Sequence, residues 1–121
     1  MNIAHIIPYS VSYPLPSHNG RYDWVLELAT RQAVAGHTVT VYGNPNSTIT
    51  GVRTAGIPHA SDDKRQNNIE TLRLAFKNNH DVYHSHFDNL HYEVASETSR
   101  PIVATQHWWP SDETIQAAHT Y

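Results

Sequence analysis

The stretch AGHTVTVY, Ala35 to Tyr42, joins the expected end of a helix to the start of a strand. Gly36 stands where a helix C-cap belongs, and the valines that follow it alternate with threonines, as in a β-strand. Upstream, residues 21–35 carry apolar side chains at spacings of three and four, which predicts a helix with Asn19 as its N-cap. Residues 2–7 form an almost unbroken apolar run, typical of a central strand that is buried on both faces. These segments predict a strand–helix–strand unit with a right-handed crossover.

The alternation of strands and helices continues through the rest of the chain. The further expected elements are a third strand at residues 51–55, a helix capped by Ser61 or Asp62 and ended by Asn78 and Asn79, a fourth strand at 81–85, a short helix from Asn89 to Ala95, a fifth strand at 102–105 and a last helix capped near Ser111. This order predicts an α/β fold: a Rossmann-like open parallel sheet of about five strands, ordered 3-2-1-4-5, with helices on both faces.

The composition excludes several classes of protein. The chain has 121 residues, which is about one domain, and a formal net charge of −3 with scattered basic residues, so we expect no nucleic-acid partner. It has no cysteine, which excludes a disulfide framework and a thiolate zinc site. The start MNIAHIIP lacks the basic and long apolar segments of a signal peptide, and no apolar run is long enough for a transmembrane helix. We therefore expect a cytoplasmic protein.

Two histidines are expected where strands end. The stretch PIVATQH, Pro101 to His107, carries His107 just beyond the fifth strand, and DVYHSH carries His86 beyond the fourth. In an open α/β sheet the ligand crevice lies outside the carboxyl ends of the strands. Both histidines are therefore candidates for a functional edge, together with the long, turn-rich loop that precedes Gly20.

Three segments, in this order, resemble the N-terminal domain of family 4 glycosyltransferases (glycosyl transferase group 1), which have the two-domain GT-B architecture. They are IAHIIP with its following loop and helix, the junction AGHTVTVY, and the pair DVYHSH and PIVATQH. Each motif is weak alone, and their order and spacing over residues 2–107 make the resemblance specific. By this resemblance, residues 1–121 are expected to be an incomplete N-terminal, acceptor-side domain, without the C-terminal donor-binding domain.

The resemblance also implies an activity. A sugar would pass from a nucleotide-sugar, such as a UDP- or GDP-sugar, to a sugar or lipid-linked acceptor, with retention of configuration and without a cofactor or an obligatory metal. The implied site residues are His107 as the catalytic residue, Asn19, Gly20 and Arg21 at the donor phosphates, and His86, Trp108 and Trp109 at the acceptor. The required partner is a C-terminal GT-B domain, in cis or as a separate chain, so the 121-residue chain alone is expected to be inactive.

The sequence departs from the family pattern in the phosphate loop. The family has two adjacent glycines there, whereas this chain has Asn19 followed by Gly20. Asparagine tolerates the positive φ that the missing glycine would supply. Taken alone, Gly20 also fits an ordinary turn glycine, and His107 fits a strand-end histidine that binds water or a backbone carbonyl. Trp108 and Trp109 equally fit the cover of a core edge or of a domain interface.

A metal site is a further interpretation of the histidines. His84 and His86 lie two apart on a predicted strand, so their side chains share a face, and with His91 or His107 they could bind zinc. The family pattern explains both without a metal, and we predict none. The histidines at 59, 80 and 119 are expected on the surface or in loops.

Two interpretations concern partners and function class. Arg65, Arg73 and Lys77 give the second helix a basic face that could contact anionic lipid at the inner membrane surface, although a solvated helix face explains them as well. The alternative to a glycosyltransferase is a non-catalytic Rossmann-like or flavodoxin-like binding or regulatory module, because such sheets carry many functions.

Overall fold

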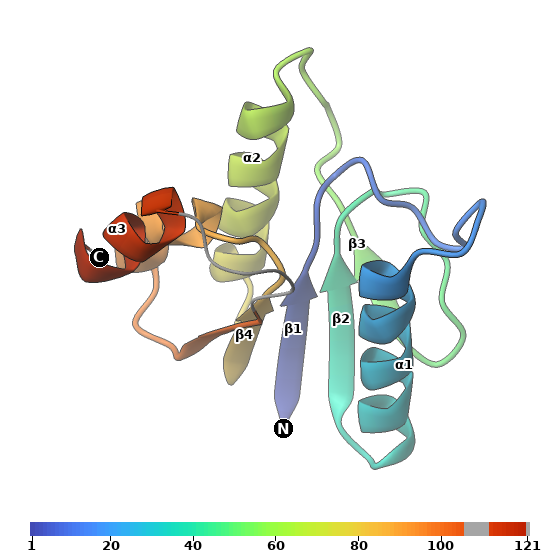
Figure 1. Cartoon of the computed structure of the whole chain (residues 1–121). Coiled ribbons are helices and arrows are strands. Elements are labelled where there is room, and N and C mark those ends of the chain that lie inside the picture. The colour runs from blue at the N-terminus through green and yellow to red at the C-terminus, as the bar shows by residue number, and fades with distance from the viewer. Residues whose placement is uncertain (106–111, 121) are drawn as a thin grey trace.

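The computed structural model describes residues 1–105 and 112–120 (Figure 1). The elements in chain order are β1 (Asn2–Ile6), α1 (Gly20–Val34), β2 (Thr38–Tyr42), β3 (Arg53–Ala55), α2 (Lys64–Lys77), β4 (Val82–Ser85), the 3₁₀ turns η1 (Leu90–Glu93) and η2 (Ala95–Glu97), β5 (Ile102–Ala104) and α3 (Asp112–Thr120). None of the helices in this described part of the chain is long and apolar enough to cross a membrane.

The five strands form one open, all-parallel sheet in the order β3-β2-β1-β4-β5. This confirms the predicted α/β, Rossmann-like fold class and its strand order. β1 lies at the centre, where Ile3 pairs with Val39 of β2 and with Val82 of β4. Four of the five β1 residues are buried, as expected for a strand covered on both faces.

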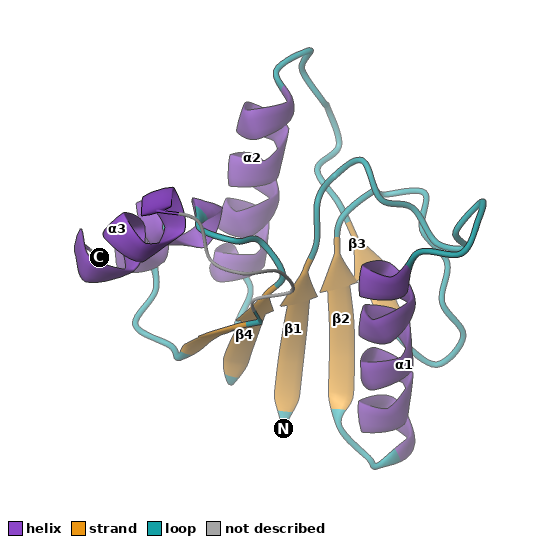
Figure 2. Ribbon diagram, in the orientation of Figure 1, coloured by secondary structure: helices purple, strands orange, loops and turns teal. Residues whose placement is uncertain are grey.

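Helices pack against both faces of the sheet (Figure 2). On one face, Ala4 and Ile6 of β1 pack with the α2 side chains Ile69, Leu72 and Ala75. On the other face, the cluster around Ile7 and Val41 includes Val25 and Ala29 of α1. Successive strand residues point to opposite faces, so the near-continuous apolar run of β1 supplies both cores at once.

The caps explain where the two long helices begin and end. The side chain of Asn19 accepts a hydrogen bond from the Tyr22 amide, as expected for the α1 N-cap, and Gly36 has the predicted left-handed conformation after the helix, with φ of 101°. The prediction of Ser61 or Asp62 as the α2 cap is wrong. Asp63 is the cap, because its carboxylate accepts from the Gln66 amide, while the Ser61 hydroxyl accepts from the Asp63 amide one turn earlier.

Two other segments differ from the prediction. Gly51 has a φ of 78° in a tight turn that links Ile49 with Val52, so β3 begins only at Arg53. The helix expected from Asn89 is two short 3₁₀ turns, because Val94 between them leaves the helical conformation with φ of −121° and is buried in the core.

His80 lies in a loop, as expected, but it is buried rather than on the surface. It is 5% exposed, and its two ring nitrogens lie 2.6 Å from the Tyr42 hydroxyl and 2.6 Å from Oδ1 of Asn2. The reason is that the loop before β4 lies against Asn2 at the amino end of β1, and the side chain of Tyr42, the last residue of β2, extends to the same ring.

Candidate functional site at the carboxyl edge of the sheet

The carboxyl ends of β1, β4 and β5 meet at one edge of the sheet, near the first turn of α1 (Figure 1). His5 of β1 and His84 of β4 are direct neighbours in the parallel register, and His84 is paired in turn with Val103 of β5. Residues paired in register share a face, so these side chains lie on the α1 side of the sheet. His86 follows the last residue of β4.

Three imidazole rings gather at this edge. Nδ1 of His5 lies 3.0 Å from Nε2 of His86, and the rings of His84 and His86 stack with their centroids 4.3 Å apart. The His5 and His84 centroids are 5.1 Å apart. His5 and His86 are fully buried, whereas His84 is only partly buried. We call His5, His84 and His86 the histidine cluster.

Neighbouring polar groups orient two of these rings. Nε2 of His5 lies 2.7 Å from Oε1 of Gln32 in α1. A carbonyl oxygen only accepts, so Nε2 of His5 carries the proton and Nδ1 offers a lone pair. Nε2 of His84 lies 2.5 Å from the hydroxyl oxygen of Thr105, just beyond β5. Burial lowers the pKa of His5, an effect that the hydrogen bond to Gln32 partly opposes, so this imidazole is neutral at neutral pH.

Trp24 of α1 forms a wall beside the cluster. Its ring meets His84 and His86 edge-on, with centroid distances of 6.3 and 6.0 Å, and the side chain is 43% exposed. Val103, next to His84 on the neighbouring strand, is 49% exposed. The edge therefore offers an accessible surface that combines apolar groups with a partly buried imidazole. An incoming molecule would reach His84 before the fully buried His86.

The predicted phosphate loop lies at the same end of α1. Among the described residues, Asn19 to Tyr22 line an open hollow of about 470 Å³. Asn19 does not use the positive φ that asparagine tolerates: its φ is −142°, and this extended conformation lets the side chain cap the helix, as predicted. A Cβ added at Gly20 would meet nothing within 4 Å, so the fold itself does not require a glycine there.

Arg21 connects this loop with the end of β4. Its side chain is 21% exposed, and its guanidinium lies 3.9 Å from the carboxylate of Asp88, which follows His86 by two residues. The structure thus brings Arg21 and His86 to one edge, as predicted. It also sets an acidic group beside the arginine, and an incoming phosphate would have to compete with it.

The remaining predicted site residues divide into two groups. His107, Trp108 and Trp109 lie outside the described residues, as does the cap expected at Ser111. His91, considered as a third metal ligand, lies on the other face, where its Nδ1 is 2.9 Å from the hydroxyl of Ser85. Ser85 and His84 are consecutive in β4 and so point to opposite sides of the sheet.

His5 and Gln32 were missed by the sequence reasoning. His5 is the only polar residue in the apolar run from Ile3 to Ile7, and this contrast was a usable signal. His5 belongs to the site because the parallel register of β1 and β4 places it beside His84, and this register could not be predicted from the sequence.

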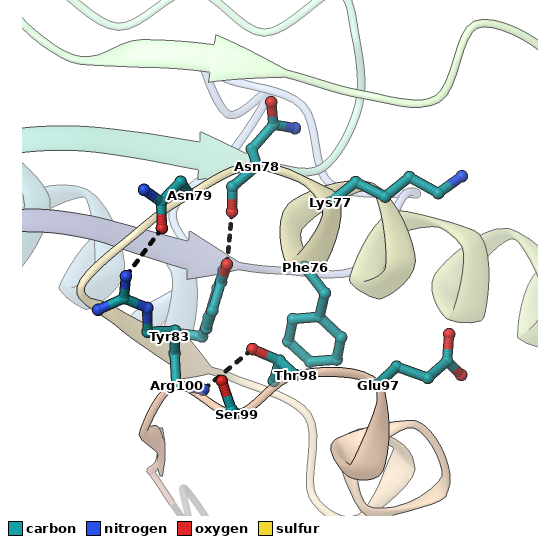
Figure 3. A pocket seen from close by; sticks show the side chains of 9 residues that line it. All are labelled: Phe76, Lys77, Asn78, Asn79, Tyr83, Glu97, Thr98, Ser99 and Arg100. Atoms are coloured by element: carbon teal, nitrogen blue, oxygen red, sulfur yellow. Dashed lines mark hydrogen bonds between the residues drawn. The ribbon is translucent and has the colours of Figure 1, made fainter.

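A second pocket lies at the opposite edge, before the strands β4 and β5 begin (Figure 3). Its volume is about 280 Å³, and its lining residues are Phe76, Lys77, Asn78, Asn79, Tyr83, Glu97, Thr98, Ser99 and Arg100. Arg100 donates to Oδ1 of Asn79 over 3.2 Å, and the Tyr83 hydroxyl donates to the carbonyl of Asn78. These hydrogen bonds stabilise the turns that precede the two strands. Ligands of such sheets bind beyond the carboxyl ends of the strands, so this pocket at the amino edge is not the candidate site.

The basic residues of α2 are partly engaged within the molecule. Arg65 pairs with Glu93, and Arg73 lies 3.0 Å from Glu70 and 3.1 Å from Glu97. Two of the three cations considered for lipid contact therefore have acidic neighbours.

Comparisons with known proteins add no family to this description. No protein-family model matches the chain, and no curated protein matches it either. The function must therefore be argued from the residues and their geometry.

Proposed function

We propose that this chain is the N-terminal, acceptor-side domain of a retaining GT-B glycosyltransferase. The observation that carries the proposal is that two of the segments that resemble the glycosyltransferase family lie at the same edge of the sheet. The loop before α1 and the segment that ends in His86 are far apart in sequence, yet Arg21 faces Asp88 and Trp24 contacts His86. Both lie beyond the carboxyl ends of parallel strands, where ligands of such sheets bind.

The donor phosphates would lie at the first turn of α1. The N-terminus of a helix carries a partial positive charge and amide groups that favour anions, and the hollow at Asn19 to Tyr22 opens there. Arg21 adds a full positive charge. Its 3.9 Å separation from Asp88 is longer than a close ion pair, so a diphosphate can draw the guanidinium away at modest cost.

The acceptor would lie over the histidine cluster. His84 is the reachable imidazole, His86 stacks beneath it, and the exposed parts of Trp24 and Val103 provide apolar surface for a sugar face. The proposed catalytic residue, His107, follows β5 by a few residues, and Trp108 and Trp109 are the further proposed acceptor contacts. The donor sugar and its base would be held by a second GT-B domain, so the activity needs that partner.

The test is a transfer assay with and without the second domain. The chain is joined to, or mixed with, a donor-binding GT-B half, and transfer from labelled UDP- and GDP-sugars to simple sugar and lipid-linked acceptors is measured. We expect transfer only when both halves are present. Robust transfer by the 121 residues alone, or none from a complete pair across the panel, contradicts the proposal.

Matched arginine variants locate the phosphate site. Arg21→Gln is expected to raise the KM for the nucleotide-sugar by about tenfold, the effect of losing one charge-assisted hydrogen bond of about 1.4 kcal/mol. Arg53→Gln is the control, because this arginine is exposed and lines a different hollow, together with Asn2 and Asn79. Equal effects of the two substitutions would contradict a phosphate role for Arg21.

The competing candidate is a non-catalytic binding or regulatory module. It is favoured by the fact that Asn19 caps α1 and Arg21 faces Asp88, so both have structural roles already. Absence of any second Rossmann-like half in the same reading frame or an adjacent gene supports the module.

A further inference from the structure

We propose that His5, His84 and His86 form a binding site for a divalent transition-metal ion, with Zn²⁺ as the reference ion. One ring nitrogen from each histidine lies within 4.8 Å of the others. In the part of the chain that the structure describes, this is the one group of three or more potential ligands gathered in this way. The inference goes beyond the proposed sugar transfer, which uses no metal.

The spacing of two nitrogens already suits an ion. Zn–N bonds are about 2.0–2.1 Å long, so two ligands of a tetrahedral ion lie about 3.3–3.4 Å apart. Nδ1 of His5 and Nε2 of His86 are 3.0 Å apart, close to this value. In the free protein Nε2 of His86 donates to Nδ1 of His5. On metal binding the His86 proton would move to Nδ1 of the same ring, so that Nε2 of His86 and Nδ1 of His5 both offer a lone pair to the ion. His84 supplies the third nitrogen, which lies within 4.8 Å of the other two.

The outer partners match those of metal-binding histidines. Such histidines usually hold their second nitrogen against a carbonyl, carboxylate or other polar oxygen, which fixes the ring and its tautomer. Gln32 does this for His5, and the Thr105 hydroxyl lies against Nε2 of His84. In this arrangement Nδ1 of His5 and Nδ1 of His84 face the ion, together with Nε2 of His86. Burial supports the neutral form of His5 that a ligand must have.

The ligand set selects the class of metal. Three imidazoles without a thiolate or carboxylate favour Zn²⁺, Co²⁺, Ni²⁺ or Cu²⁺ over Mg²⁺ and Ca²⁺, which prefer oxygen ligands. Three protein ligands also leave a fourth position for water or a ligand hydroxyl, as in sites that act on bound molecules. That position would open toward the exposed side of Trp24.

The experiment is calorimetric titration of the untagged 121-residue chain with ZnCl₂ alone near pH 7.5. We expect one equivalent to bind with a Kd in the micromolar range or tighter. His84→Gln should weaken binding by at least about 100-fold through loss of a direct ligand, and Gln32→Leu by about tenfold through loss of an orienting partner. The matched control is His59→Gln, an exposed histidine outside the cluster, which should leave the Kd unchanged.

A second measurement, the visible absorption of bound Co²⁺, distinguishes metal bound at the histidine cluster from metal bound by surface histidines. Co²⁺ bound by three imidazoles and water should give visible absorption bands that His84→Gln abolishes and His59→Gln keeps. If His84→Gln fails to fold by circular dichroism, Gln32→Leu and Thr105→Val carry the comparison. The proposal is overturned if no stoichiometric binding occurs, or if cluster variants bind like wild type. Because metal binding is measured directly, failure of sugar transfer leaves the result interpretable.

Discussion

Acid should destabilise this protein in a way that can be traced to His91. This side chain is 2% exposed, and burial lowers its pKa to about 4, although Asp88 pulls in the opposite direction. Nδ1 of His91 lies 2.9 Å from the Ser85 hydroxyl, which itself accepts a hydrogen bond from the Phe87 amide. The hydroxyl proton is thus directed at a ring nitrogen that must stay unprotonated to receive it.

The sign and size of this loss of stability follow from two pKa values of His91, 6.5 in the unfolded chain and about 4 in the folded protein. Above pH 6.5 the imidazole is neutral in both states, and stability does not depend on it. Between pH 6.5 and about 4 the unfolded chain binds a proton that the folded protein refuses, so the free energy of unfolding falls as the pH falls. From about pH 7.5 to about pH 5 this amounts to about 2 kcal/mol, or a fall in Tm of roughly 10 °C for a chain of this size. His5 and His80, whose pKa values burial also lowers, add to the loss.

The assay is urea unfolding at a series of pH values, compared between wild type and His91→Asn. Asparagine keeps a polar atom near Ser85 but does not titrate, so the variant should lose about 2 kcal/mol less than wild type over this range. The smaller side chain also lowers the free energy of unfolding of the variant at every pH, and this constant term cancels when the losses between about pH 7.5 and about pH 5 are compared. His59→Asn is the control and should follow wild type. Equal losses in wild type and His91→Asn would refute the argument.

Three further predictions concern the fold and the loop. Leu72→Ala should cost about 2–5 kcal/mol in urea unfolding, because Leu72 is fully buried between α2 and the sheet, and a cost below about 1 kcal/mol would contradict its place in the core. Asp63→Ala should lower the free energy of unfolding by about 1 kcal/mol through loss of the α2 cap, whereas Asp62→Ala should stay within about 0.5 kcal/mol of wild type. A larger effect of Asp62→Ala would show that Asp62 is the cap, as the sequence had suggested. Gly20→Ala should fold with equal or up to about 1 kcal/mol higher stability, since its Cβ meets open space; if the proposed two-domain glycosyltransferase is assembled, its binding of a nucleotide-sugar should fall. Unfolding of Gly20→Ala would show that the glycine is structural.

The sequence predicted the sheet well because its signals are local. The apolar run of β1, the Gly36 stop after α1 and the valine–threonine alternation of β2 each reflect a backbone preference that acts within a few residues. Cap positions were harder to predict, because neighbouring polar residues compete. Ser61, Asp62 and Asp63 can all cap a helix, and the bond from Ser61 to the Asp63 amide decides among them.

The candidate site was only half visible in the sequence. The spacing of His84 and His86 placed both rings on one side of β4, as the stacked rings confirm. His5 is 79 residues before His84, and no local pattern connects them. Only the parallel register of β1 with β4, and the packing of α1 over that face, bring His5, Gln32 and Trp24 to the same place.

The sequence by itself determined the order of the elements and that β1 is buried on both faces, because period, apolar runs and capping are properties of short segments. The tertiary structure alone decided that a single polar residue in a buried strand would meet two more histidines at the carboxyl edge. The physical reason is that cross-strand neighbours depend on register, and register is set when the two cores on either side of β1 are packed together.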